Sequence, residues 1–126
     1  MKKSISTNQA PQAIGPYSQA TAVGNLVFVS GQIPLDPNTG QIIGSDIKTQ
    51  TKQSFENIKG ILTSQGLTMN HVAKATVLLA DIQDFAGMNE VYAEYFDEPY
   101  PARAAFAVKD LPKGALVEIE VIASID

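Results

Sequence analysis

Cysteine is absent from this sequence of 126 residues, and histidine occurs only once, as His71. The absence of cysteine excludes disulfide bonds, thiolate nucleophiles and thiolate metal sites. His71 has no carboxylate or second histidine close to it in the chain, and a lone histidine of this kind is more often a surface residue than a catalytic one. Chemistry that depends on a thiol or on a pair of histidines is therefore not expected.

Long apolar runs and an excess of positive charge are also absent. No segment approaches the roughly 18 apolar residues of a membrane-spanning helix, and the opening MKKSISTNQAPQ lacks the apolar core of a signal peptide. Basic residues number 9 against 13 acidic ones, which gives a net charge of −4. Because Lys and Arg drive binding to phosphate backbones, this balance argues against a nucleic-acid partner. We expect a cytoplasmic protein without a nucleic-acid or membrane partner.

What the sequence does contain is typical of one folded domain that covers residues 1–126. Apolar residues make up 44% of the chain and charged residues 17%. Two β-rich runs around Gly24-Asn25 predict a hairpin, and apolar residues at spacings of three or four predict two helices. The first helix has Asp46 as its N-cap and Gly66 just past its end. The expected elements are a hairpin over 20–31, helices over 46–65 and from 84 onward, and strands over 71–81, 102–108 and 116–124.

These elements predict an α+β domain with a mostly antiparallel sheet and both helices on one face. Two of the strands carry large apolar side chains on both faces. In the first strand, Leu26 and Phe28 lie on one face and Val27 and Val29 on the other. In the second, Val72 and Leu78 lie on one face and Val77 and Leu79 on the other. Because two helices cover only one face, the other face needs a cover that this short chain does not provide. We expect that cover to be another subunit.

Arg103 is the only charged residue in the apolar stretch PYPARAAFAV, residues 99–108. If the last two strands pair as a hairpin, alternation of side chains puts Arg103 opposite Glu120, or opposite Glu118 after a slip of two residues. One interpretation is a solvated cross-strand ion pair that contributes ~0.2–1 kcal/mol. The other is a charged pocket floored by alanines, in which the guanidinium holds the carboxylate of a small ligand. Spacing alone favours the ion pair.

Four stretches of the chain resemble the RidA/YjgF family, the reactive intermediate deaminases. They are AIGPYSQA, VFVSGQIPLDPNTG, NEVYAEYF and YPARAAFAVKDLPKGALVEIE, and the similarity extends over nearly the whole chain. The resemblance implies a chorismate-mutase-like α+β fold with a six-stranded sheet. It also implies a homotrimer with an active site in each cleft between subunits, which would supply the missing cover of the sheet.

The resemblance further implies a hydrolytic deaminase. Its substrates would be 2-imino acids and their 2-enamino tautomers, such as 2-iminopropanoate and 2-aminoacrylate, and its products 2-oxo acids and ammonia. Arg103 matches the arginine that binds the substrate carboxylate, and Glu118 matches the acid that orients or activates the water. The pocket residues implied by the same match are Tyr17, Ser30, Gly31, Asn89 and Ala105. Many relatives have cysteine where this chain has Ala105, so only the backbone contributes there, and the segment DEPYP before Arg103 is shorter than in relatives.

The implied reaction needs little machinery, because a protonated imine is already a strong electrophile. Holding the carboxylate, placing one water and supplying a modest base are enough, so no metal or organic cofactor is expected. An arginine beside Glu118 would keep that carboxyl ionised and make it a weak base. Two other functions stay open. One is a non-catalytic regulatory trimer that binds small carboxylic acids, and the other is RNA cleavage, which the acidic composition disfavours.

Overall fold

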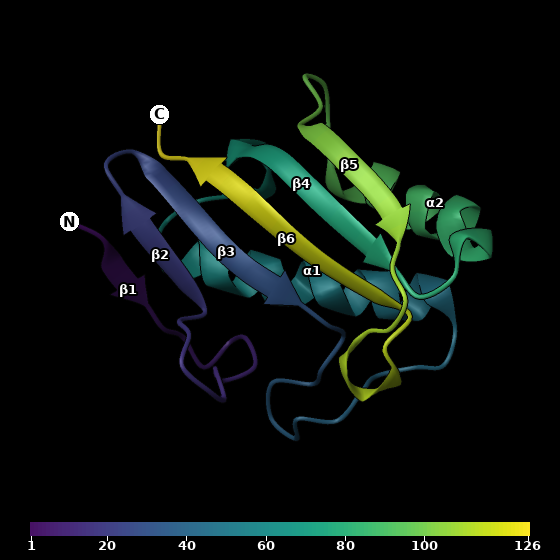
Figure 1. The fold of residues 1–126 in the computed structure, drawn as a ribbon. Coiled ribbons are helices and arrows are strands. Elements are labelled where there is room, and N and C mark those ends of the chain that lie inside the picture. The colour runs from purple at the N-terminus through teal and green to yellow at the C-terminus, as the bar shows by residue number, and fades with distance from the viewer.

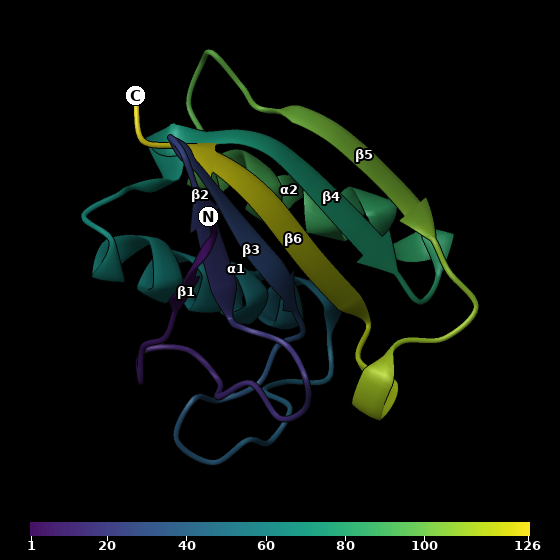
Figure 2. The same cartoon turned by 60° about the vertical axis from the view of Figure 1, so that its left-hand side comes forward.

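The computed structural model describes residues 1–126 as one six-stranded sheet with two helices (Figure 1). The strands are β1 (Lys3–Ile5), β2 (Ala20–Val23), β3 (Leu26–Gln32), β4 (Val72–Leu79), β5 (Ala102–Ala107) and β6 (Val117–Ser124). Their order across the sheet is β1-β2-β3-β6-β4-β5, and only the β4–β5 pair is parallel. The helices are α1 (Ile47–Ser64) and α2 (Phe85–Tyr95), and both lie on the same side of the sheet (Figure 2). The α+β class and the placement of the helices are confirmed.

Helix α1 forms where the sequence pattern predicts it. The Asp46 carboxylate accepts a hydrogen bond from the Thr49 backbone N–H at 3.0 Å, which satisfies one of the N–H groups left free at a helix start. Past the other end, Gly66 adopts a φ of 72°, a conformation that glycine tolerates because it has no Cβ. Between these ends the apolar stripe faces the core, and its members Phe55 and Ile58 are fully buried.

The hairpin predicted around Gly24-Asn25 also forms. β2 and β3 pair antiparallel with Val23 opposite Leu26, and Gly24 takes a positive φ of 59° in the two-residue turn. β3 pairs on its other side with β6. The register of that pairing shifts between Val29 and Gln32, so the end of β3 is irregular at the point where it reaches the site described below.

The last two strands do not form the predicted hairpin. β6 lies between β3 and β4, and β5 lies at the edge of the sheet, parallel to β4. The chain crosses over from β4 to β5 through α2, because a parallel pair cannot be joined by a tight turn. β6 takes a central place because one of its faces is wholly apolar and buried. The residues of that face are Val117, Ile119, Val121 and Ala123.

The face of the sheet opposite the helices is uncovered, as predicted, and it carries apolar side chains. Phe28 is 39% exposed and Phe106 is 47% exposed. The half-buried apolar residues on the same face are Leu26, Leu78 and Ile122. Simple alternation predicts Val72 there too, but a bulge between Val72 and Lys74 turns this side chain into the core.

The fold also bears on two smaller expectations, one about His71 and one about membrane-spanning helices. His71 has a local role: the Thr68 backbone N–H donates to its Nδ1 at 3.0 Å, which caps the short 3-10 turn Met69–His71 before β4. Neither α1 nor α2 has the length and apolar character that a membrane-spanning helix needs.

Candidate active site

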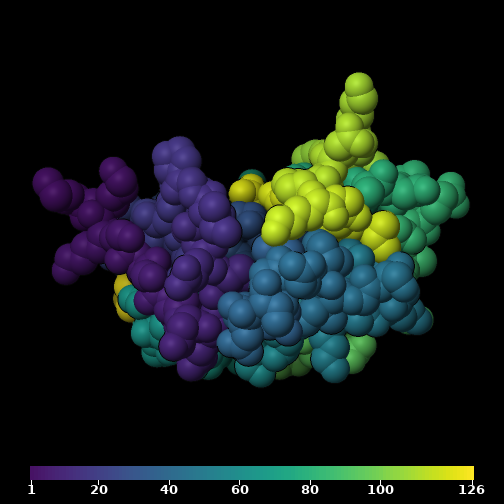
Figure 3. Space-filling model, turned by 90° about the horizontal axis from the view of Figure 1, so that it is seen from below, coloured from purple at the N-terminus to yellow at the C-terminus, as the bar shows by residue number.

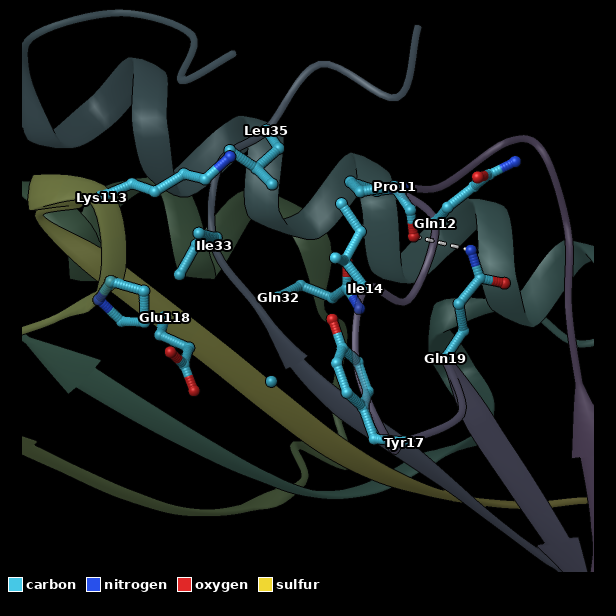
Figure 4. Close-up of a pocket in the computed structure, with 12 residues that line it drawn as sticks. Pro11, Gln12, Ile14, Tyr17, Gln19, Gln32, Ile33, Leu35, Lys113 and Glu118 are labelled. Carbon is cyan, nitrogen blue, oxygen red and sulfur yellow. Dashed lines mark hydrogen bonds between the residues drawn. The ribbon is translucent and has the colours of Figure 1, made fainter. Parts of the chain in front are cut away.

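An open cavity of about 460 Å³ lies where β3 ends and β6 begins. The N-terminal segment, the loop after β3 and the turn before β6 form its walls, and these segments adjoin one another on the surface in Figure 3. The residues that line it include Tyr17, Gly31, Gln32, Leu35, Lys113 and Glu118. Figure 4 shows Glu118 and Tyr17 on different walls. The size is within the range of small-molecule sites.

Glu118 occupies its place in this cavity because residue 31 is glycine. Its carboxylate lies directly against Gly31 of β3. A Cβ atom at Gly31 would collide with the carboxylate and would lie 2.9 Å from the carboxyl carbon, closer than real Cβ atoms come. Glycine at this irregular point of β3 therefore leaves the room that the acid needs.

Burial raises the pKa of the Glu118 carboxyl above its ordinary value, and the negative charge of Glu120 raises this pKa further. No cation is paired with Glu118, since the chain's one salt bridge joins Lys48 of α1 to Glu90 of α2. Within one chain, no arginine lies beside Glu118 to keep it ionised, although the sequence interpretation expected one. A carboxylate whose pKa is raised is a stronger base than an ordinary glutamate.

Arg103 lies on β5 at the outer edge of the sheet, and its side chain packs on α2. Its Nη1 donates a hydrogen bond to Asn89 Oδ1 at 2.6 Å. Its guanidinium carbon lies 4.6 Å from the ring centre of Tyr92 and 5.5 Å from that of Phe85. These three partners share one face of α2, where residues three or four apart are neighbours. Uncharged groups thus hold the cation, and its other N–H donors make no hydrogen bond within the chain.

Within one chain, Arg103 and Glu118 lie on opposite faces of the sheet. Arg103 is in register with Ala75, which is buried beneath the helices. Glu118 is in register with Leu78, three residues along β4 and therefore on the other face. Both interpretations of the sequence, the ion pair and the one-sided pocket, require these two side chains on one face. Both are wrong, because β5 and β6 are not neighbours in the sheet.

Three of the predicted pocket residues gather with Glu118. Tyr17 and Gly31 line the cavity. Ser30 adjoins them on β3, and its hydroxyl donates to the Ser18 backbone carbonyl at 2.7 Å. Ser30 thereby ties the N-terminal wall of the cavity to the sheet, and its hydroxyl is already in use.

The other two predicted pocket residues accompany Arg103 at the edge. Asn89 accepts the hydrogen bond from the guanidinium. Ala105 follows two residues along β5, in register with Val77 and so on the helix side of the sheet. The predicted residues therefore form two groups rather than one. Asn89 contacts Arg103, whereas the sequence match implies an asparagine that contacts the ligand.

Two of the buried glutamines, Gln19 and Gln50, hold segments that form the cavity walls, and the sequence interpretation missed both. The Gln19 amide accepts from the Thr7 backbone N–H at 2.7 Å and donates to the Pro11 carbonyl at 2.7 Å, which folds the N-terminal segment into a wall. Gln50 of α1 accepts from the Leu116 N–H at 2.8 Å, just before β6. A polar residue on the buried side of α1 is a signal that could have identified Gln50. The partners of Gln19 lie too far away in sequence to be inferred.

A family model described as Endoribonuclease L-PSP matches residues 7–125. The chain belongs to this family, the RidA/YjgF family. A RutC family protein of Pyrococcus horikoshii is 58% identical over 98% of this chain and 98% of its own. The 2-iminobutanoate/2-iminopropanoate deaminase of Bos taurus is 50% identical over 98% of this chain and 90% of its own. The crystal structure of E. coli TdcF with bound serine has a TM-score of 0.91 and 46% identity, and the match covers 97% of this chain and 98% of that one.

The RidA/YjgF resemblance predicted from the four sequence motifs is thus confirmed over nearly the full length of the chain. The α+β fold is also shared with TdcF. The match to that structure covers 97% of this chain, including both helices and the sheet, with a TM-score of 0.91. The names of the RidA/YjgF relatives are not uniform, however, and include RutC proteins, imine deaminases and endoribonucleases. The function of this chain must therefore be argued from its site.

Proposed function

We propose that the protein is a hydrolytic deaminase that converts small 2-imino acids and their 2-enamino tautomers to 2-oxo acids and ammonia. The observation that carries the proposal is Glu118, a half-buried carboxyl with a raised pKa that faces a cavity and has no cation paired to it. Groups in this state are typical of general bases in enzyme sites. The relative from Bos taurus, named as an imine deaminase, supports the substrate class.

The second part of the proposal is that each active site forms between two subunits of a homotrimer. One small substrate cannot touch both Arg103 and Glu118 of the same chain, because the sheet separates them. The uncovered face, with Phe28 and Phe106 exposed, offers apolar surface to a neighbouring subunit. A head-to-tail contact repeated around a threefold axis closes a ring, and it brings the β5 edge of one chain beside the cavity of the next.

In such a cleft, Arg103 binds the substrate carboxylate, because its unused N–H donors match two carboxylate oxygens. Glu118 of the partner subunit takes a proton from a water molecule, whose oxygen attacks C2 of the protonated imine. The adduct then carries a hydroxyl and an amino group on C2. Glu118 of the partner subunit returns the proton to this nitrogen. The C–N bond breaks, the oxygen forms the ketone, and the hydroxyl proton leaves with the departing ammonia as ammonium.

A second candidate function is a non-catalytic trimer that binds small carboxylic acids in the same cleft. The TdcF structure supports it, because serine is an amino acid with a carboxylate of the kind that Arg103 would bind. The two functions share Arg103 but differ at Glu118, which only catalysis requires. RNA cleavage, suggested by the family description, is disfavoured by the net charge of −4 and by a cavity with Lys113 as its only cationic residue.

The test uses an amino-acid oxidase to release 2-imino acids in the presence of semicarbazide, which reacts faster with the imine than with the 2-oxo acid. The protein is expected to lower the initial rate of semicarbazone formation, because it hydrolyses the imine first. Glu118→Gln is the matched control, since it keeps the shape of the side chain but removes the base. An unchanged rate with the wild-type protein contradicts the deaminase and favours the binding trimer.

The assembly is tested separately by sedimentation. We expect a mass of about three times 13.5 kDa at micromolar concentration. A stable monomer with full activity would contradict the shared site.

A further inference from the structure

We infer that the rings of Tyr92 and Phe85 hold the Arg103 guanidinium in the orientation that receives the substrate carboxylate, so that both are positioning residues. The inference rests on the proposed function, because it concerns the same arginine. It extends that function by assigning a role to two aromatic residues of α2.

The three groups that hold Arg103 come from one rigid element. Phe85, Asn89 and Tyr92 follow one another along α2 at spacings of four and three, so they lie on one face of the helix. Asn89 fixes one edge of the guanidinium through Nη1, while the two rings lie within the distance at which cations are attracted to aromatic rings. An arginine at an exposed sheet edge otherwise samples many rotamers, and ordering it on binding costs affinity.

The ring of Tyr92, rather than its hydroxyl, is the part that acts. Tyr92 is 7% exposed, and its Oη is buried without a hydrogen-bond partner, which is uncommon for a buried polar atom. Burial raises the pKa of this phenol, so it stays neutral at physiological pH. The ring in turn packs on Phe96 and Phe55, with centroids 4.7 Å and 5.7 Å away. Through the Tyr92 ring, Arg103 therefore packs on the hydrophobic core.

The experiment measures the affinity of the full-length protein for pyruvate, a 2-oxo acid product analogue, by calorimetry. We expect Tyr92→Phe to bind pyruvate as the wild type does, because the ring is kept. Tyr92→Leu is expected to weaken binding about fivefold to tenfold, the size of one cation–π contact together with the ordering of the side chain. Val91→Ala is the matched control. It removes buried apolar volume from the same helix but none of the three groups that hold Arg103, so it should lower Tm and leave affinity unchanged.

A spectroscopic signal reports the orientation directly. In the wild type and in Tyr92→Phe, the Arg103 Nε–H resonance should be shifted by the ring current of residue 92. In Tyr92→Leu it should move toward the position of a free arginine. If Tyr92→Leu fails to fold, Phe85→Leu at the half-buried start of α2 tests the same point, with a smaller loss of affinity because its ring is farther from the guanidinium.

Each contrary result has a distinct meaning. Wild-type affinity in Tyr92→Leu, or an equal loss in Val91→Ala, overturns the inference. An equal loss in Tyr92→Phe also overturns it, because the hydroxyl would then be responsible. Failure of the proposed function shows up elsewhere, as a wild-type protein that binds pyruvate but does not hydrolyse imines. In that case the affinities of the variants still decide whether the rings position Arg103.

Discussion

The edge of the sheet beside α2 and the cavity on the uncovered side each hold one charged side chain, in contrasting surroundings. Arg103 is exposed and is supported by an amide and two aromatic rings, none of which carries charge. Glu118 is half-buried and lies against a glycine, and the negative charge of Glu120 raises its pKa. Neither side chain is neutralised by a partner within its own chain.

Within one chain, this separation leaves both groups free for the proposed reaction. An ion pair between Arg103 and Glu118 would occupy the donors that a substrate carboxylate needs, and it would lower the pKa of the base. Placing them on opposite faces of the sheet prevents this ion pair from forming within the chain. The proposed site therefore takes the two groups from different subunits.

Removing the cation should have the largest effect. Arg103→Ala is expected to reduce kcat/KM for 2-imino acids on the order of a hundredfold or more, because each charge-assisted hydrogen bond contributes ~1.5–3 kcal/mol. Arg103→Lys should restore little, since an ammonium cannot form the same two parallel bonds. The control is Tm on the same samples, which should change little because Arg103 is exposed. Full activity in Arg103→Ala would show that this edge is not part of the site.

Removing the base should affect turnover rather than binding. Glu118→Gln is expected to lower kcat about a hundredfold, the lower end of what a general base contributes. Its affinity for pyruvate should stay close to that of the wild type, because Arg103 makes the carboxylate contact. Unchanged turnover would transfer the role to Glu120 or to a backbone carbonyl. A loss of affinity as large as that in Arg103→Ala would mean that Glu118 also binds the substrate, and the two groups would then not have separate roles.

Displacing the base should have an intermediate effect. Gly31→Ala forces the Glu118 carboxylate to move, because the new Cβ would collide with it, and a misplaced catalytic group costs roughly ten- to a hundredfold in kcat. The stability cost should be small, since the flexible end of a side chain can move aside. In a Glu118→Gln background the same substitution should cause no further loss of rate. An additional loss there would mean that Gly31 acts independently of Glu118.

The smallest expected effect is on how the stability of the protein depends on pH. A raised pKa means that the folded protein binds the Glu118 proton more tightly than the unfolded chain does. Stability contributed at this position is therefore present at low pH and is lost as pH rises through the raised pKa. Glu118→Gln should raise Tm slightly at pH 7, and the difference should vanish below about pH 4. The acid limb of wild-type kcat/KM should also lie above the ordinary glutamate range. A Tm difference independent of pH would contradict the raised pKa.

Local sequence signals predicted most of the fold. The N-cap Asp46, the stop at Gly66 and the Gly24 turn act through neighbouring residues, and each forms as expected. The pairing of β5 with β4 was not predictable in this way, because it depends on a crossover through α2 and on the wholly apolar buried face of β6. Alternation along each strand was assigned correctly for Arg103 and for Glu118. Only the assumption that consecutive strands are neighbours was wrong, and it placed them on one face.

In the proposed trimer, Arg103 of one subunit and Glu118 of another serve one substrate. Refolding Arg103→Ala and Glu118→Gln chains together in equal amounts tests this claim. In a mixed ring, a cleft is intact when a chain with a native arginine meets a chain with a native glutamate. Random mixing therefore predicts recovery of about a quarter of wild-type activity from two inactive parents. A mixture that forms trimers but stays as inactive as either parent would contradict the claim.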